Sequence, residues 1–294
     1  MSAEARLRFY ASAFDTVEIN SSFYAIPDVR NAHLWVTRTP ANFLFHVKAY
    51  SLLTGHHPQA AALPAELQAG LPANVKKTRH GAIDASTFSA EAVEDAFRLF
   101  RTALTPLAQA RKLGYVLFQL APWVRFSHAQ LDYVTSLPQR LPGWTIAVEF
   151  RDRSWYAAAS ATLPALRTAG VAHVVVDAPQ TPNAVPRVTT ATAPAAVFRL
   201  HGRNADGWLR QLQGKEPTVQ EKYDYLYSGE ELQELLPEIR ALVEEAGQVD
   251  VVFNNNNRDY PVTNALQLRR LLGQRTPDVE ELRAAYSAPR PKGP

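Results

Sequence analysis

The chain has 294 residues, of which 46% are hydrophobic and 20% charged, and its formal net charge at pH 7 is +3. This composition supplies enough apolar material for a core. The chain contains no cysteine, which excludes disulfides, zinc–thiolate sites and thiol nucleophiles. The mild positive charge is no nucleic-acid signature by itself, and no apolar run approaches the about 18 residues of a membrane span. We therefore expect a cytoplasmic protein with no membrane partner.

Seven short segments are rich in β-branched and aromatic residues and are predicted to form strands. In chain order they are 14–20, 42–48, 114–120, 144–150, 172–178, 196–202 and 249–255. Most intervals between them have helical periodicity, as in the apolar stripe from Val93 to Leu107, and Ser127 and Ser228 begin capping-box patterns. Strands that alternate with helices predict parallel pairing with right-handed crossovers.

This alternation predicts an α/β fold, a TIM-type (β/α) barrel in which seven strands are visible, one fewer than a closed barrel has. No linker divides the chain, so residues 1–280 are predicted to form one domain. Residues 51–83, after the second strand, form a Pro/Ala/Gly-rich insertion of the kind that serves as a functional lid or as mobile surface. Residues 281–294 are expected to be a disordered tail.

Polar residues two apart recur at the predicted strand ends, each pair flanked by apolar neighbours. Because side chains alternate across a strand, each pair shares one face, which points into the barrel near its mouth. Burying several charges is costly unless they are paired or meet a ligand, and active sites of such barrels lie at the carboxyl ends of their strands. We interpret the pairs as a functional pocket, with a purely structural charge network as the alternative; they are Glu18/Asn20, His46/Lys48, Glu149/Arg151 and Arg199/His201.

Other candidates follow the remaining strands and the loops after them, namely Gln119, Asp177, Asn254, Asn255, Tyr24, Trp155 and Tyr227. Each has a structural alternative. Trp155 and Tyr24 can be packing residues, Asp177 can cap the following loop, and the asparagines can form a turn.

The segments that carry these residues resemble, in order, the signature blocks of the YecE-like family ("domain of unknown function 72"). They are VEIN-SSFY (17–24), FLFHVK (43–48), LFQLAPW (117–123), VEFRDRSW (148–155), FRLHGR (198–203), YDYLYSGEEL (223–232) and VVFNN (251–255). The resemblance implies a TIM-type barrel without a settled activity. Family members usually open with a Gly-rich first strand that this sequence lacks. Either translation starts upstream of Met1, which we favour because an open parallel edge exposes backbone groups and apolar core, or the barrel has a gap between its first and last visible strands.

The residue types lead to one main hypothesis, in which a small anionic or zwitterionic ligand binds at the barrel mouth, where the same residues could transform it by acid–base chemistry. The proton-transfer candidates are Glu18, His46, Glu149, Asp177 and His201. The candidate ligand-binding residues are Asn20, Tyr24, Lys48, Gln119, Arg151, Trp155, Arg199, Tyr227, Asn254 and Asn255. No cofactor is predicted, and the sequence does not specify an oligomeric state or decide whether the protein is an enzyme.

Two alternatives stay open. The same acidic and histidine side chains suit divalent metals, which would allow a metal-dependent phosphodiesterase acting on nucleic acid, with Lys76, Lys77 and Arg79 as backbone contacts. Against it, a Lys or Arg lies two residues from three of those candidates. The other alternative is a non-catalytic metabolite-binding protein. The sequence has no GxGxxG or Walker-type loop after a strand and no GxSxG motif, which argues against nucleotide-fold and serine-hydrolase chemistry.

Overall fold

The computed structural model describes residues 2–72, 74–78, 80–181, 184–206, 223–255, 257–278 and 280. Its seven strands are all parallel and follow one another around a single curved sheet in chain order. They are β1 (Thr16–Ile19), β2 (Leu44–Lys48), β3 (Leu113–Gln119), β4 (Thr145–Glu149), β5 (Ala172–Asp177), β6 (Ala195–Leu200) and β7 (Gln248–Phe253). The predicted strands are therefore confirmed, as is the TIM-like α/β fold.

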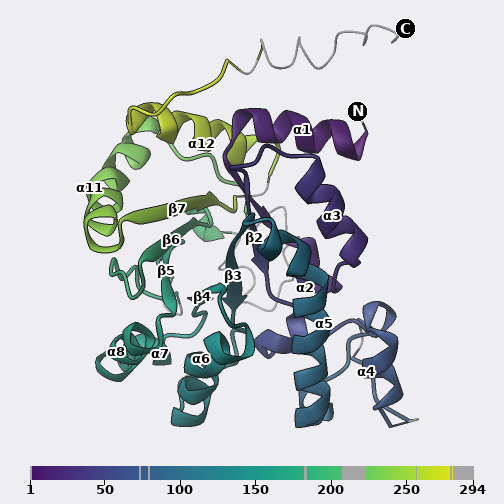
Figure 1. Cartoon of the computed structure of the whole chain (residues 1–294). Helices are drawn as coiled ribbons and strands as arrows, with labels where there is room; N and C mark the ends of the chain where they lie inside the picture. Colours follow the sequence, from purple (N-terminus) through teal and green to yellow (C-terminus); the bar gives the residue numbers. More distant parts are fainter. Residues whose placement is uncertain are drawn as a thin grey trace, which may run out of the picture.

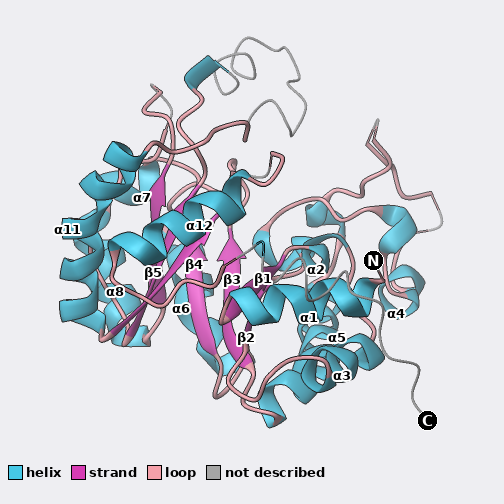
Figure 2. Ribbon diagram, turned by 90° about the horizontal axis from the view of Figure 1, so that it is seen from above, coloured by secondary structure: helices cyan, strands magenta, loops and turns pink. Residues whose placement is uncertain are grey.

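Helices surround the sheet on its outer side (Figures 1 and 2). The helices of eight or more residues are α1 (Ala3–Ala13), α3 (Val29–Thr37), α5 (Ala90–Gln109), α6 (His128–Arg140), α8 (Ala159–Ala169), α11 (Gly229–Ala246) and α12 (Tyr260–Leu271). The shorter ones are α2 (Ser21–Tyr24), α4 (Ala65–Ala69) and α7 (Ser154–Ala157), with 3-10 turns at Ser51–Thr54, Ala60–Ala62 and Ala85–Thr87. The predicted helix starts are confirmed, because Ser127 caps α6 and Ser228 forms a reciprocal capping box with Glu231 on α11.

Alternation along the strands divides the core into two layers. Outward-facing residues such as Phe45, Val47 and Phe118 pack with the surrounding helices, including the predicted apolar stripe of α5. Inward-facing residues such as Leu117 and Val174 fill the lower barrel. The polar pairs continue the inward face toward the carboxyl ends of the strands, as the period of two requires.

The insertion after β2 packs on the barrel over its described part. Two isolated antiparallel bridges lie within it, Gln59 with Ala82 and Lys77 with Ile83. Five of its side chains are buried in the main core, namely Leu52, Leu53, Leu63, Leu67 and Ile83. The described part of the insertion is therefore anchored to the barrel, because it contributes apolar side chains to the core. Arg79 and the predicted tail 281–294 lie outside the described residues.

The ring of strands is nearly closed, with a gap between β1 and β7. Among the described residues, β1 pairs only with β2 and β7 only with β6. The amide of Leu44 donates to the carbonyl of Asp15, and the amide of Asn254 donates to that of Leu200. Since backbone groups of successive residues point to opposite sides of a strand, those directed into the gap belong to Thr16, Glu18, Val249, Val251 and Phe253.

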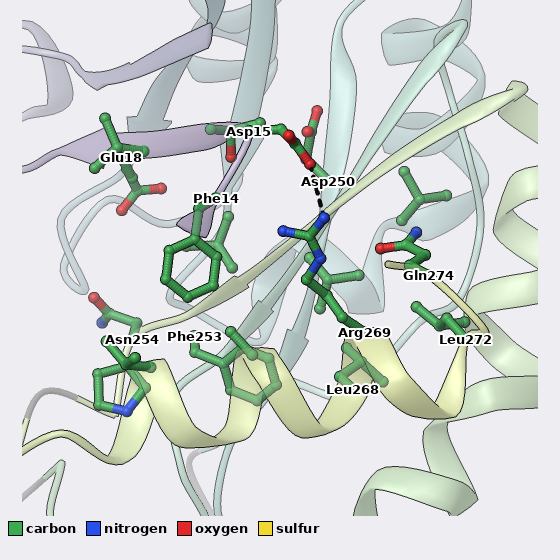
Figure 3. A pocket seen from close by; sticks show the side chains of 18 of the residues that line it. Phe14, Asp15, Glu18, Asp250, Phe253, Asn254, Leu268, Arg269, Leu272 and Gln274 are labelled. Atoms are coloured by element: carbon green, nitrogen blue, oxygen red, sulfur yellow. Dashed lines mark ion pairs between the residues drawn. The ribbon is translucent and has the colours of Figure 1, made fainter. Parts of the chain in front are cut away.

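The gap contains a cavity of about 490 Å³ between the two strand edges (Figure 3). Phe14, Phe253 and Leu268 supply apolar wall, and Glu18 and Asp250 reach it from the inward faces of β1 and β7. The seven-stranded barrel thus has two unlike sides, one fully hydrogen-bonded and one open along an apolar and acidic groove.

Candidate functional site

Arg199 lies at the centre of a buried ion-pair network in the upper barrel. Its side chain projects inward from β6 and is 1% exposed. The guanidinium donates to both carboxylate oxygens of Glu18, from Nε at 3.1 Å and from Nη2 at 2.6 Å. Its Nη1 donates to Glu149 and lies 3.4 Å from Oε1 of Gln119. One bidentate arginine therefore ties together β1, β3, β4 and β6.

Glu149 extends the network toward the mouth. Its Oε1 accepts from Nη1 of Arg151 at 2.8 Å and lies 3.2 Å from Nε2 of His201. The side-chain amide of Asn254 lies 3.0 Å from Nδ1 of the same imidazole. If that amide donates to Nδ1, the imidazole proton is on Nε2 and is directed at Glu149. The predicted pairs Glu149/Arg151 and Arg199/His201 are thus brought together.

Burial and charge fix the protonation of these groups. Burial alone would raise the pKa of Glu149, but Arg199, His201 and Arg151 together hold that pKa well below its ordinary value. Burial lowers the pKa of His201 to about 4, against the opposing effect of Glu149. At neutral pH the network therefore contains a charged carboxylate beside a neutral imidazole.

Lys48 borders this network at the carboxyl end of β2. An aromatic rim lies beside it, formed by side chains of α2, of the insertion and of the loop after β3. The Nζ of Lys48 lies 4.3 Å from the ring centroid of Phe23. His56 meets Phe23 edge-on at 4.8 Å, and its pKa is lowered to about 4 by burial and by the charge of Lys48. The ring of Trp123 stacks on that of His57, with 5.1 Å between the ring centroids. Trp123 is 55% exposed and Tyr24 is 62% exposed.

Sequence reasoning missed four of these rim residues, Phe23, His56, His57 and Trp123. The signal for Trp123 was its position just after the third strand, in the loop that follows a barrel strand's carboxyl end. His56 gave no such signal, because it lies in the insertion, whose packing the sequence pattern does not reveal.

His46 lies one layer below the mouth and is packed. Its ring stacks on Tyr115 at 3.9 Å, its Nδ1 accepts from the Tyr115 amide at 3.2 Å, and its Nε2 lies 3.3 Å from Asp250. A Cβ at Gly114 would come within 2.3 Å of the imidazole, so this position requires glycine. The structure therefore places His46 beneath the Glu18–Arg199 network, without access from the mouth.

Asp177 and Tyr227 do not line the mouth. Asp177 lies on the outer face of β5, and Tyr227, in the segment just before α11, contacts it there. The Asp177 carboxylate accepts from Arg187 at 2.6 Å, from Arg203 at 3.0 Å and from the Tyr227 hydroxyl at 2.7 Å. Val175, two residues earlier, packs outward with α11 side chains. The expected convergence of Asp177 with Glu149 is not found, and the physical reason is strand parity, which places residue 177 opposite to the inward-facing Val176.

Two other predicted ligand-binding residues are structural. Trp155 stacks on Phe150 at 4.3 Å, donates to the carbonyl of Val124 and is 1% exposed. The Asn255 amide donates to the carbonyl of Tyr225 and to Asn264. Their structural alternatives are the ones that the geometry supports.

The groove beside the network has its own charges (Figure 3). Arg269 of α12 donates to the carbonyl of Ala13 at 2.8 Å and lies 3.3 Å from the Asp15 carboxylate. Asn20 and Asn254 line the same cavity. Because Glu18 also lines it, the ion-pair network can be approached from the groove as well as from the mouth.

The candidate metal ligands do not gather into one centre. Within the described part of the chain, no group of three or more His, Cys, Asp or Glu side chains is placed to hold a metal ion. Glu18 and Glu149 are held by Arg199, His46 lies below them and Asp177 lies outside the strand ring. In that same part of the chain, no helix is long and apolar enough to cross a bilayer.

Comparisons with known proteins agree with this architecture. The chain is 32% identical over 274 residues to UPF0759 protein YunF of Bacillus subtilis (strain 168), a match that covers 92% of this chain and 87% of the relative. A crystal structure of a DUF72 family protein from Enterococcus faecalis V583 matches with a TM-score of 0.76 and 28% identity, covering 93% of this chain and 90% of that one. A DUF72 family protein from Thermotoga maritima MSB8 matches with a TM-score of 0.71 and 28% identity, covering 93% and 91%.

The family model for "Protein of unknown function DUF72" matches residues 1–291, nearly the whole chain. Six of the seven sequence blocks that resembled this family lie at the carboxyl ends of strands, and the seventh, residues 223–232, runs into the start of α11. The chain belongs to the DUF72 family.

Proposed function

We propose that the barrel mouth binds a small anionic or zwitterionic ligand, with Lys48 and Arg151 as its cationic contacts. The observation that carries the proposal is the charge balance of the network. Three cations, Lys48, Arg151 and Arg199, border two carboxylates, and both carboxylates are already bound by Arg199. One positive charge is therefore left at the mouth for a ligand anion.

The surroundings of that charge fit a small ligand. Arg151 is 12% exposed, so its guanidinium borders the mouth while it stays anchored to Glu149. The exposed rings of Tyr24 and Trp123 offer faces to the ammonium group of a zwitterion. The carboxylate of such a ligand would contact Lys48, and the ligand's ammonium group would contact the aromatic rim.

Acid–base chemistry by Glu149 or His201 receives less support than binding. A carboxylate whose pKa is held far below neutral accepts protons weakly, and so does an imidazole with a pKa of about 4. Both groups act as the frame that orients Arg151 and Arg199. Lys48, beside them, is the group whose pKa suits proton or covalent chemistry near neutral pH.

Calorimetric titration with oxalate, phosphate and glutamate tests the proposal. We expect saturable binding of at least one of these anions, weakened about tenfold or more in Lys48→Met because a close charge-assisted contact is worth more than about 1 kcal/mol. The control is Lys76→Met, which removes the same charge from an exposed position outside the barrel mouth. Equal affinity in the two variants, or no binding by the unmodified protein, would contradict the proposal.

A further inference from the structure

Lys48 is a half-buried lysine whose ammonium group has no anionic partner. It is the last residue of β2 and shares the inward face with His46. Among the described residues, no carboxylate lies within ion-pair distance of its Nζ and no acceptor within hydrogen-bond distance. Its close neighbour is the Phe23 ring. A lysine in such a place loses hydration without gaining a countercharge.

Lys112 shows what a buried lysine with a structural role looks like in the same chain. Its Nζ donates to the carbonyl of Val36 at 2.8 Å and to the carbonyl and hydroxyl of Thr39 at 2.8 and 3.0 Å. All three ammonium protons are thus satisfied. Lys112 ties α3 to the start of β3, whereas Lys48 makes no comparable contact.

The charges around Lys48 favour its neutral form. Burial, together with the charges of Arg199 and Arg151, lowers the pKa of Lys48 to about 8 against the opposing effect of Glu149 and Glu18. The carboxylates cannot compensate fully because Arg199 already binds both. A sizeable fraction of neutral amine is therefore present near neutral pH, at the mouth rather than in the core.

We propose that Lys48 is a nucleophilic lysine that forms an imine with a small carbonyl compound bearing a carboxylate, of the oxo-acid class. The inference rests on the proposed function, with Arg151 as the cationic contact of the anion site that holds the carboxylate while the Lys48 amine meets the carbonyl carbon. Arg151, anchored on Glu149, lies on the neighbouring side of the mouth to bind that carboxylate. The Phe23 ring shields the amine from water on one side.

The step balances without an oxidant or a metal. The neutral Lys48 amine attacks the carbonyl carbon, a C–N bond forms and the carbonyl oxygen takes up a proton to give a carbinolamine. That proton comes from the attacking nitrogen. The hydroxyl then takes one proton from solvent and leaves as water while the nitrogen lone pair forms the C=N bond, so one amine, one carbonyl and one proton yield one protonated imine and one water. The cationic imine replaces the ammonium charge of Lys48 and leaves the neighbouring Glu18 and Glu149 with the same electrostatic environment.

Reductive trapping tests the inference. The protein is incubated with glyoxylate and sodium cyanoborohydride, which reduces imines to secondary amines, and modified peptides are located by mass spectrometry. We expect Lys48 to be modified at least roughly tenfold faster than Lys76 and Lys77, because its neutral fraction near pH 7.5 is on the order of 100-fold higher than that of an exposed lysine. Lys112 should stay unmodified.

Lys48→Arg keeps the positive charge and removes the amine nucleophile, so it should lose the adduct while it still binds oxalate. Oxalate, which forms no imine here, should slow trapping in the unmodified protein. If oxalate binds but Lys48 is trapped no faster than Lys76, the nucleophile is disproved while the anion site stands. If Lys48 is trapped rapidly but oxalate neither binds nor protects it, the anion site is disproved and the nucleophilic lysine stands.

Discussion

The closed and open sides of the barrel each contain an arginine, but the two arginines differ in their partners. On the closed side, β4 and β6 each pair with a neighbouring strand on both sides, and Arg199 and Glu149 form an ion pair at the centre of a buried network. On the open side, Arg269 lies between two unpaired strand edges and one of its nitrogens, Nε, has no hydrogen-bond partner. A polar side chain inside or beside the barrel therefore does not by itself indicate a site, because its partners decide its role.

The two sides differ in whether their charged groups have partners of opposite charge. Among the described residues, Arg199 and Arg151 bind the carboxylates of the closed network, whereas Lys48 at the mouth has no carboxylate within ion-pair distance. The open side combines apolar wall with acidic groups at Asp15 and Asp250, and its backbone edges lack partners among the described residues. The first arrangement is suited to holding a ligand anion, and the second is a site of local weakness in the sheet.

The largest expected difference between the two sides is in amide hydrogen exchange. The edge amides of Thr16, Val249 and Val251 should exchange with little protection because no strand pairs with them on the open side. Amides of β5, paired on both sides, should approach the global free energy of unfolding, typically about 5–15 kcal/mol. Exchange resolved to single residues by NMR checks this. Equal protection at both places would show that the open edge is covered in solution.

Replacing one arginine on each side gives the next largest effect. Arg199→Met leaves Glu18 and Glu149 buried without a partner, and we expect it to reduce the free energy of unfolding by about 3–5 kcal/mol. Arg269→Met, the matched control, removes one bond to a carbonyl and a pair with the exposed Asp15, for a loss of about 1 kcal/mol. Urea denaturation measures both. Similar losses would mean that the central network contributes no more to stability than the groove does.

Much of the fold followed from local pattern. The strand segments, the α5 stripe and the two serine caps depend on residues close in sequence, so periodicity and capping chemistry could predict them. The inward direction of the pairs Glu18/Asn20 and Arg199/His201 followed from strand parity in the same way.

The misplaced site residues depended on information that is not local. Asp177 was grouped with Glu149 because both end a strand. Side chains alternate between the two faces of a strand, so a shift of one position places a carboxylate on the opposite face. Trp155 was ambiguous because only the fold shows Phe150 stacked against it. The gap between β1 and β7 was one of two alternatives, and which residues line it depends on how α12 packs across the opening.

The smallest expected effect is the pH dependence of stability that arises from His201, the neutral histidine of the closed side. The pKa of His201 is lowered by burial from 6.5 to about 4, so the unfolded chain binds a proton at this residue before the folded protein does. Stability from this residue is therefore complete above pH 6.5 and is lost as the pH falls toward 4. Between pH 6.5 and 5 the loss should be about 1–2 kcal/mol.

His201→Gln should make the fall in unfolding free energy over this range shallower, because glutamine does not titrate and its amide can still donate to Glu149. Some slope should persist, since burial also lowers the pKa values of His173 and His56 to about 4. His33→Gln is the control, because His33 is exposed on α3 and should leave the slope unchanged. Urea denaturation at several pH values measures the slopes. An unchanged slope in His201→Gln would mean that the folded protein protonates His201 as readily as the unfolded chain does, and the network would then carry one more positive charge beside Arg151 than the structure indicates.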